Sequence, residues 1–199
     1  MRRVRSALLC GILGATLSCA QPPQAIIEAA RTAVNAAAKN ADIVTYAPES
    51  LRAAQDDLAA MDAEADRQAR RFALSRDFKA LETLAANASD AAQLAQSNAL
   101  ESKARVEQDA ATLADQVGGA IHDFEARLWS ARRLRGVQQS VIDGLSDLGN
   151  DSRASLDDAR GDLASGSYAS AKAKLSAILD RLDAAQQTID EQTGIARAR

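Results

Sequence analysis

Apolar residues recur every three or four positions along almost the whole chain after residue 24, which is the spacing of one face of an α-helix. The longest such face is rich in alanine and comprises Leu81, Ala85, Ala88, Ala92, Ala95, Ala99, Val106, Ala110, Leu113 and Val117. No proline follows Pro48, so nothing beyond it breaks a helix outright. The pattern predicts an all-α fold and excludes a sheet protein.

The first half of the chain is predicted to hold two shorter helices before this long one. The first covers residues 24–40, with an apolar face of Ile26, Ala30, Ala33, Ala37 and Ala41. Residues 42–47 are expected to be extended, because Pro48 disfavours helix at the residue before it. Pro48 then opens a helix that runs to Leu74, with an apolar face of Leu51, Ala54, Leu58, Met61, Ala65 and Phe72. Residues 75–77 supply the next turn and cap.

The long apolar face continues past two glycines, Gly118 and Gly119. Beyond them it comprises Ile121, Phe124, Leu128, Ala131, Val141, Leu145 and Leu148. Each glycine costs a helix about 1 kcal/mol relative to alanine, so a kinked or interrupted helix is predicted there. Residues 149–151 are predicted to stop it. A short helix over 152–164, a turn at 165–167, a last helix over 168–191 and a frayed tail at 194–199 follow.

A repeated spacing of apolar residues indicates how these helices pair. The apolar spacing of Leu51, Ala54 and Leu58 recurs in Leu156, Ala159 and Leu163, and each set precedes a turn followed by an aromatic residue. We therefore expect Ala-rich antiparallel hairpins forming an elongated bundle or coiled-coil-like rod. Residues 25–148 would form a long hairpin domain, and residues 149–193 a short hairpin packed on it.

The first twenty residues have the layout of a secretory signal peptide, with arginines before an apolar run at residues 7–17. That run is too short for a permanent membrane span, which needs roughly 20 residues. Residues 16–19 resemble the bacterial lipobox, in which a cysteine after a small residue is lipidated, although Thr16 stands where leucine is preferred. We favour a signal peptide over 1–18, lipidation at Cys19 and a tether over 19–24. Cleavage after Ala20, which would discard Cys19, is the alternative.

Charge and cysteine content fit an exported protein. The only cysteines, Cys10 and Cys19, lie in the targeting segment, so the body has none for a disulfide, a zinc site or a nucleophile. Cleavage before Cys19 removes three arginines and no acids, which takes the net charge from −3 to −6. Ala20 is not the aspartate that usually retains lipoproteins in the inner membrane. We expect outer-membrane anchoring that faces the periplasm, with a soluble periplasmic protein as the alternative.

Tyr46, Ala47, Pro48, Leu51, Ala54 and Leu58, with Asp77 and Phe78 further on, resemble a family of bacterial envelope proteins, the domain of unknown function 4398 family. The resemblance covers roughly residues 25–105. It implies an Ala-rich helical hairpin behind a secretory or lipoprotein signal. It supplies no catalytic residues.

Few residues carry recognisable chemistry. His122 is the only histidine and stands beside Asp123, so a solvated position is expected. Residues 147–151 faintly resemble a calcium loop but lack the later glycine and the terminal glutamate, which favours helix capping. The sequence holds neither a phosphate-binding glycine loop nor a zinc-protease pair. We expect no metal, no cofactor and no enzymatic activity.

One basic cluster stands out on the long helix. Arg127, Arg132, Arg133 and Arg135 flank Trp129. The cluster could be a basic face that meets anionic envelope polymers or lipid headgroups. The favoured interpretation is a solvated face with Trp129 in the bundle seam, where downstream aspartates neutralise the arginines. These aspartates are Asp143, Asp147, Asp151, Asp157 and Asp158.

These observations favour a non-enzymatic, lipid-anchored periplasmic protein that acts as an envelope scaffold, spacer or partner-binding module. Its partners would be the membrane, through the N-terminal lipid, and an envelope protein or a second copy of the chain. Near-balanced charge and Ala-rich seams favour neither nucleic acid nor a small-molecule substrate. The alternative is a periplasmic carrier or chaperone that holds an apolar client between its helices, and an enzyme is the third class.

Overall fold

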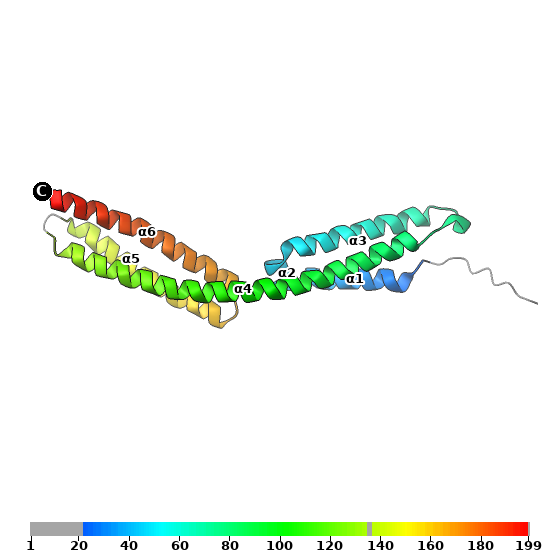
Figure 1. Cartoon of the computed structure of the whole chain (residues 1–199), viewed down its shortest axis with the longest axis horizontal. Helices are drawn as coiled ribbons and strands as arrows, with labels where there is room; N and C mark the ends of the chain where they lie inside the picture. Colours follow the sequence, from blue (N-terminus) through cyan, green and yellow to red (C-terminus); the bar gives the residue numbers. More distant parts are fainter. Residues whose placement is uncertain (1–21, 135–136, 199) are drawn as a thin grey trace, which may run out of the picture.

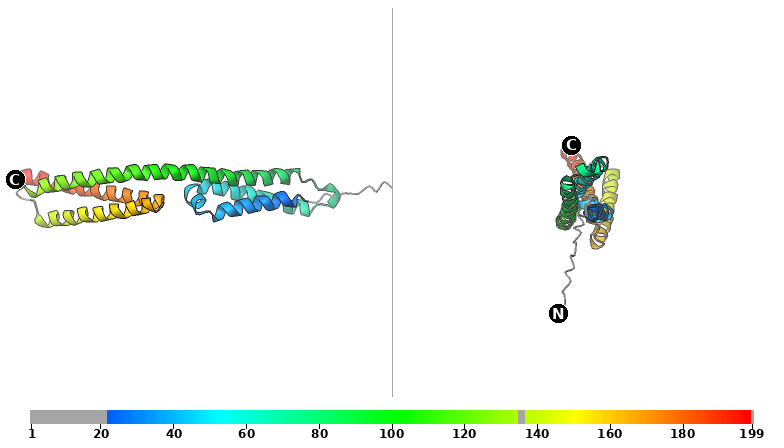
Figure 2. Two further views of the ribbon diagram at one scale, coloured as in Figure 1. Left: turned by 90° about the horizontal axis from the view of Figure 1, so that it is seen from below. Right: turned by 90° about the vertical axis from the view of Figure 1, so that its right-hand side faces the viewer.

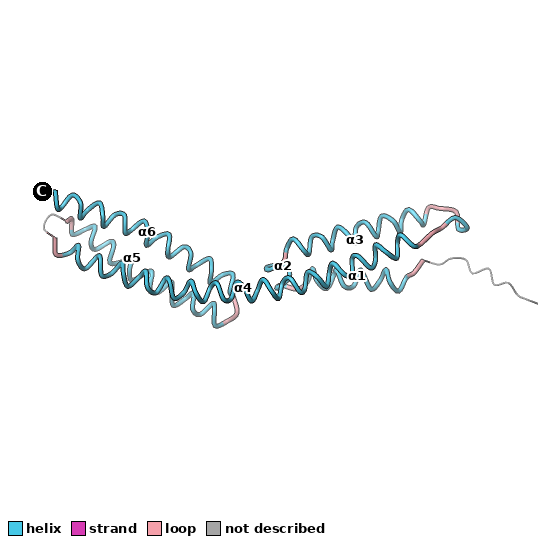
Figure 3. Tube along the Cα trace, in the orientation of Figure 1, coloured by secondary structure: helices cyan, strands magenta, loops and turns pink. Residues whose placement is uncertain are grey.

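The computed structural model describes residues 22–134 and 137–198, and it confirms the all-α fold. The helices are α1 (Gln24–Lys39), α2 (Ala41–Tyr46), α3 (Pro48–Ala69), the short 3-10 helix η1 (Ala73–Ser75), α4 (Lys79–Arg132), α5 (Gln139–Ala164) and α6 (Tyr168–Ala198). No strand occurs within those two ranges. Figure 3 shows short loops joining long helices.

The molecule is a rod organised around α4, whose 54 residues correspond to a length of about 80 Å. Helices α1, α2 and α3 pack along its first half, and α5 and α6 along its second half (Figures 1 and 2). We call these assemblies the N-terminal bundle and the C-terminal bundle. Helix α3 in the N-terminal bundle and helix α5 in the C-terminal bundle run antiparallel to α4. One helix is thus shared by two bundles placed end to end.

The two bundles have separate cores of different character. The N-terminal core, between Ile27 and Ala99, is filled largely by alanine. The predicted alanine face is confirmed there, because Ala85, Ala88 and Ala95 are all fully buried. The C-terminal core uses larger side chains around the fully buried Phe124. Small residues let helices approach closely, and alanine supplies such contacts throughout the N-terminal core.

The segment predicted to be extended is helical. Residues 41–46 form α2, and Asn40 caps it: its side-chain oxygen accepts hydrogen bonds from the backbone N–H groups of Asp42, at 2.9 Å, and Ile43, at 3.4 Å. The restriction imposed by Pro48 falls on Ala47 alone, whose ψ of 48° separates α2 from α3.

Helix α3 ends at Ala69 and not at Leu74, so Phe72 leaves the predicted apolar face and is 74% exposed. Glu64 and Gln68 take buried positions near the end of the helix instead. The Gln68 side chain donates to Glu64 Oε1 at 2.7 Å and accepts from the backbone N–H of Asp77 at 3.2 Å. This polar chain closes the turn into α4.

The second half differs from the prediction in where its helices end. Helix α4 is not interrupted at Gly118 and Gly119, and it ends at Arg132, whereas the predicted apolar face continued to Leu148. Helix α5 then runs unbroken through the predicted stop at residues 149–151, so the expected division between residues 148 and 149 falls inside it. Buried contacts on α4 hold that stretch in helix despite its turn-forming composition.

At the end of the chain, the turn at residues 165–167 is confirmed, with Gly166 at a φ of 80° that suits glycine. Helix α6 continues to Ala198, beyond the predicted end at residue 191 and through most of the predicted frayed tail. The signal peptide, Cys19 and Arg135 lie outside the described residues.

Candidate functional surfaces

The predicted basic cluster lies near the C-terminal end of α4, at the end of the rod opposite to the start of α1. The structure divides the cluster between two flanks of the helix. Arg127 faces α6, whereas Arg132 faces α5. The four described residues therefore do not form the single basic face that one interpretation of the sequence required.

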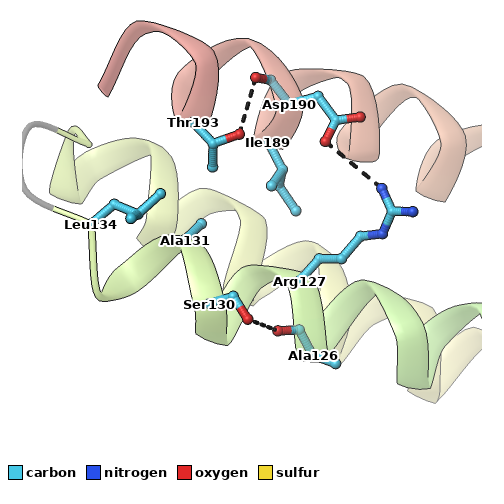
Figure 4. Close-up of a pocket in the computed structure, with 8 residues that line it drawn as sticks. All are labelled: Ala126, Arg127, Ser130, Ala131, Leu134, Ile189, Asp190 and Thr193. Atoms are coloured by element: carbon cyan, nitrogen blue, oxygen red, sulfur yellow. Dashed lines mark hydrogen bonds and ion pairs between the residues drawn. The ribbon is translucent and has the colours of Figure 1, made fainter. Parts of the chain in front are cut away.

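On the α6 flank, Arg127 forms an ion pair with Asp190, with 3.7 Å between Arg127 Nη1 and Asp190 Oδ1 (Figure 4). The pair spans an open groove of about 390 Å³. Its lining residues are Ala126, Arg127, Ser130, Ala131, Leu134, Ile189, Asp190 and Thr193. Both charged side chains are more than half exposed, so the pair contributes little to stability.

On the α5 flank, Trp129 is 56% exposed, and the prediction that it lies in the bundle seam is wrong. The guanidinium carbon of Arg133 lies 3.2 Å from the centre of the Trp129 ring, a cation–π arrangement. Arg132 donates a hydrogen bond to the hydroxyl of Ser146. Trp129 and Arg132 line a second groove, of about 280 Å³, between α4 and α5.

In the described part of the chain, the aspartates expected to neutralise these arginines do not pair with them, and other carboxylates lie near the cluster. Asp190 pairs with Arg127, and Glu125 pairs with Arg153 across the second groove. Among the described residues, Asp157 pairs with Arg160, and the other predicted aspartates form no ion pair. The end of the rod thus presents mixed charge around an exposed aromatic ring.

A second polar group, not found by sequence reasoning, lies where the two bundles meet. Lys103 of α4 pairs with Asp42 of α2 at 2.8 Å and lies 6.0 Å from the ring centre of Tyr46. A hydrogen bond to Glu107 raises the pKa of Tyr168, the first residue of α6. Two residues one turn apart on α4 therefore interact with different bundles, Lys103 with α2 and Glu107 with the first residue of α6. Aromatic residues at these two helix ends were the available sequence signal.

His122 is exposed, as predicted. In the described ranges, no group of three histidine, cysteine or carboxylate side chains is arranged to hold a metal ion. None of the described helices is both long and apolar enough to cross a membrane.

Comparison with known proteins found no matching family model, no similar curated protein and no similar solved structure.

Proposed function

We propose that this chain is a non-enzymatic, lipid-anchored periplasmic spacer that holds a partner at a fixed distance from the membrane. The observation that carries the proposal is the unbroken α4, a helix about 80 Å long that links two bundles into one rod. A helix buried on one side along both halves resists bending, because bending would open both cores. Such a construction favours a mechanical role over a chemical one.

The predicted lipidation site belongs to one end of this rod, and the Trp129 region lies at the other. Cys19 precedes the start of α1 by five residues, which span at most about 17 Å. Helix α1 begins at the end of the rod farthest from the C-terminal end of α4. A lipid on Cys19 would therefore hold one end of the rod at the membrane, and the Trp129 region would project away from it.

The carrier alternative receives less support from the geometry. An apolar client needs a sizeable apolar cleft, whereas alanine contacts bring α1, α3 and α4 together around fully buried residues. The two grooves near Arg127 and Trp129 are open and are lined by charged residues as well as apolar ones. We therefore place the partner contact at the far end of the rod.

Two measurements in cells test the proposal. Mass spectrometry of the mature N-terminus should show a lipidated Cys19, and Cys19→Ser should stop the protein from partitioning into detergent with the membranes. A photo-crosslinking amino acid at Trp129 should give a discrete protein adduct, whereas one at the exposed Glu82 near the other end should not. An unmodified N-terminus, or adducts from Glu82 alone, would contradict the spacer assignment.

A further inference from the structure

The loop between α3 and α4 exposes apolar side chains to an unusual degree. We call residues 70–76 the tip; they are Arg70, Arg71, Phe72, Ala73, Leu74, Ser75 and Arg76. Phe72 is 74% exposed and Leu74 is 80% exposed, more than any other large apolar side chain of the described chain. Single exposed apolar residues need no explanation, but two within three residues of one loop form a patch.

The charge of the tip is entirely positive. It contains three arginines and no acidic residue. Arg70 and Arg71 form no ion pair with the described carboxylates, in contrast to Arg67, which pairs with Glu64 at 2.6 Å. The protein as a whole is acidic, with a net charge of −3, and acidic residues flank the tip at Asp66 and Asp77, so the positive charge is confined to the loop itself.

The tip is held in shape by its own hydrogen bonds. The Ser75 hydroxyl donates to the carbonyl of Phe72 at 2.8 Å. The Arg76 guanidinium donates to the carbonyls of Arg71, at 3.2 Å, and Ala69, at 3.1 Å, at the end of α3. Phe72 and Leu74 therefore project from an ordered loop. A surface that binds them loses little free energy to ordering the loop.

The tip also lies at the N-terminal end of the rod. Pro22 lines the same groove, of about 290 Å³, as Arg76 and Phe78. Figures 1 and 2 show the start of α1 and the connection from α3 to α4 at one end of the molecule. The 21 residues that precede Pro22, with the predicted lipidation site, thus join the rod beside the tip.

We propose that the tip binds the surface of an anionic lipid bilayer. Phe72 and Leu74 enter the boundary between headgroups and acyl chains, while Arg70 and Arg71 meet headgroup phosphates. Apolar side chains flanked by arginines are the combination that such an interface favours. Beside the predicted anchor, the tip would supply a second contact with the membrane and orient the rod. The inference builds on the proposed membrane placement but does not need a lipid on Cys19.

A fluorescence experiment tests the contact without the anchor. The chain from Ala20 onward keeps all the described helices, and Trp129 is its only tryptophan, at the opposite end of the rod. Combining Trp129→Phe with Phe72→Trp moves the only indole to the tip. Vesicles of phosphatidylcholine and phosphatidylglycerol with brominated acyl chains should quench this indole and shift its emission to the blue. The same vesicles should leave Trp129 of the parent chain unquenched.

Sedimentation with the same vesicles tests which residues bind. Phe72→Ser with Leu74→Ser should weaken binding by about tenfold or more. Leu94→Ser with Leu100→Ser removes apolar residues of comparable exposure from α4 and should have little effect. Arg70→Gln with Arg71→Gln should remove the preference for phosphatidylglycerol and the sensitivity to salt. All these chains lack Cys19, so failure of the anchor cannot affect the result.

Three results would overturn the inference. They are absence of vesicle binding, equal loss in the two serine pairs, and quenching of Trp129 instead of the indole at the tip. Capture of a protein by the tip in cells, without vesicle binding, would assign this loop to a protein partner and would likewise reject it.

Discussion

Gly149 of α5 packs against the ring of Phe124 of α4: a Cβ atom built on the glycine would lie 3.4 Å from Cε1 of Phe124. Phe124 is fully buried in the C-terminal core, and Gly149 is itself buried. The glycine therefore allows α5 to approach α4 closely at this point. It is a packing residue within a helix and not a helix stop.

Gly149→Leu should destabilise the protein, because the added carbons have to displace the Phe124 ring; overpacking costs about 1–3 kcal/mol. The control is Gly144, on the same helix, where a Cβ meets nothing within 4 Å. Gly144→Leu should stabilise the protein by up to about 1 kcal/mol, the gain in helix propensity. Urea unfolding measures both, and equal free-energy changes would show that the contact with Phe124 does not shape the bundle.

The alanine face of α4 provides a second matched pair. Ala88 is fully buried in the N-terminal core, and Ala86 is exposed on the same helix. Ala88→Leu should lower the free energy of unfolding by about 1–3 kcal/mol, because leucine does not fit a close helix contact. Ala86→Leu should have almost no effect, since leucine forms helix nearly as well as alanine. A similar loss of stability in both variants would mean that α4 does not pack on α1 and α3 as described.

Hydrophobic spacing was sufficient to predict the buried face of α4, because a helix with one buried side repeats its apolar residues with a period near 3.6. It did not predict the end of α4 at Arg132, because the apolar spacing continues into α5. The predicted face from Leu81 to Ala99 is buried throughout. Spacing failed where a local signal competed with packing. Residues 149–151 have the composition of a turn, but they stay helical because the buried residues on either side of them, Leu145 and Leu156, pack in the C-terminal core.

The candidate surfaces were predictable in part. The arginines near Trp129 could be found from sequence, but their division between two flanks depends on where α5 and α6 pack. The tip was missed because Phe72 continues the apolar phase of α3, whereas the helix ends at Ala69. Its basic run from Arg70 to Arg76 was visible in the sequence and would have been the signal to follow.

The turn between α5 and α6 should respond to acid. Lys174 and Ser170, bonded to the Asp162 carboxylate at 2.8 and 2.7 Å, hold the pKa of Asp162 below its ordinary value of 3.8. The stabilisation is complete above that ordinary value and is lost as the pH falls through the lower folded-state pKa. Asp162→Asn should therefore lower the melting temperature at neutral pH, and the difference should vanish in acid.

The control for this prediction is Asp151→Asn, an exposed position on the same helix. It should change the melting temperature little at any pH. Thermal melts followed by circular dichroism across the acid range measure both variants. A difference for Asp162→Asn that persists unchanged in acid would show that the ion pair does not cause it.

Helix α4 is one continuous, gently curved support for both bundles, and the distance between two positions near its ends tests this most directly. Spin labels on Ala86→Cys and Ser130→Cys, both exposed on α4, are separated by 44 residues in a chain from Ala20 that has no other cysteine. Pulsed electron spin resonance should give one narrow distribution near 65 Å, since an α-helix rises about 1.5 Å per residue. A broad distribution, or one centred below about 50 Å, would show a hinge in α4 and contradict the rigid spacer.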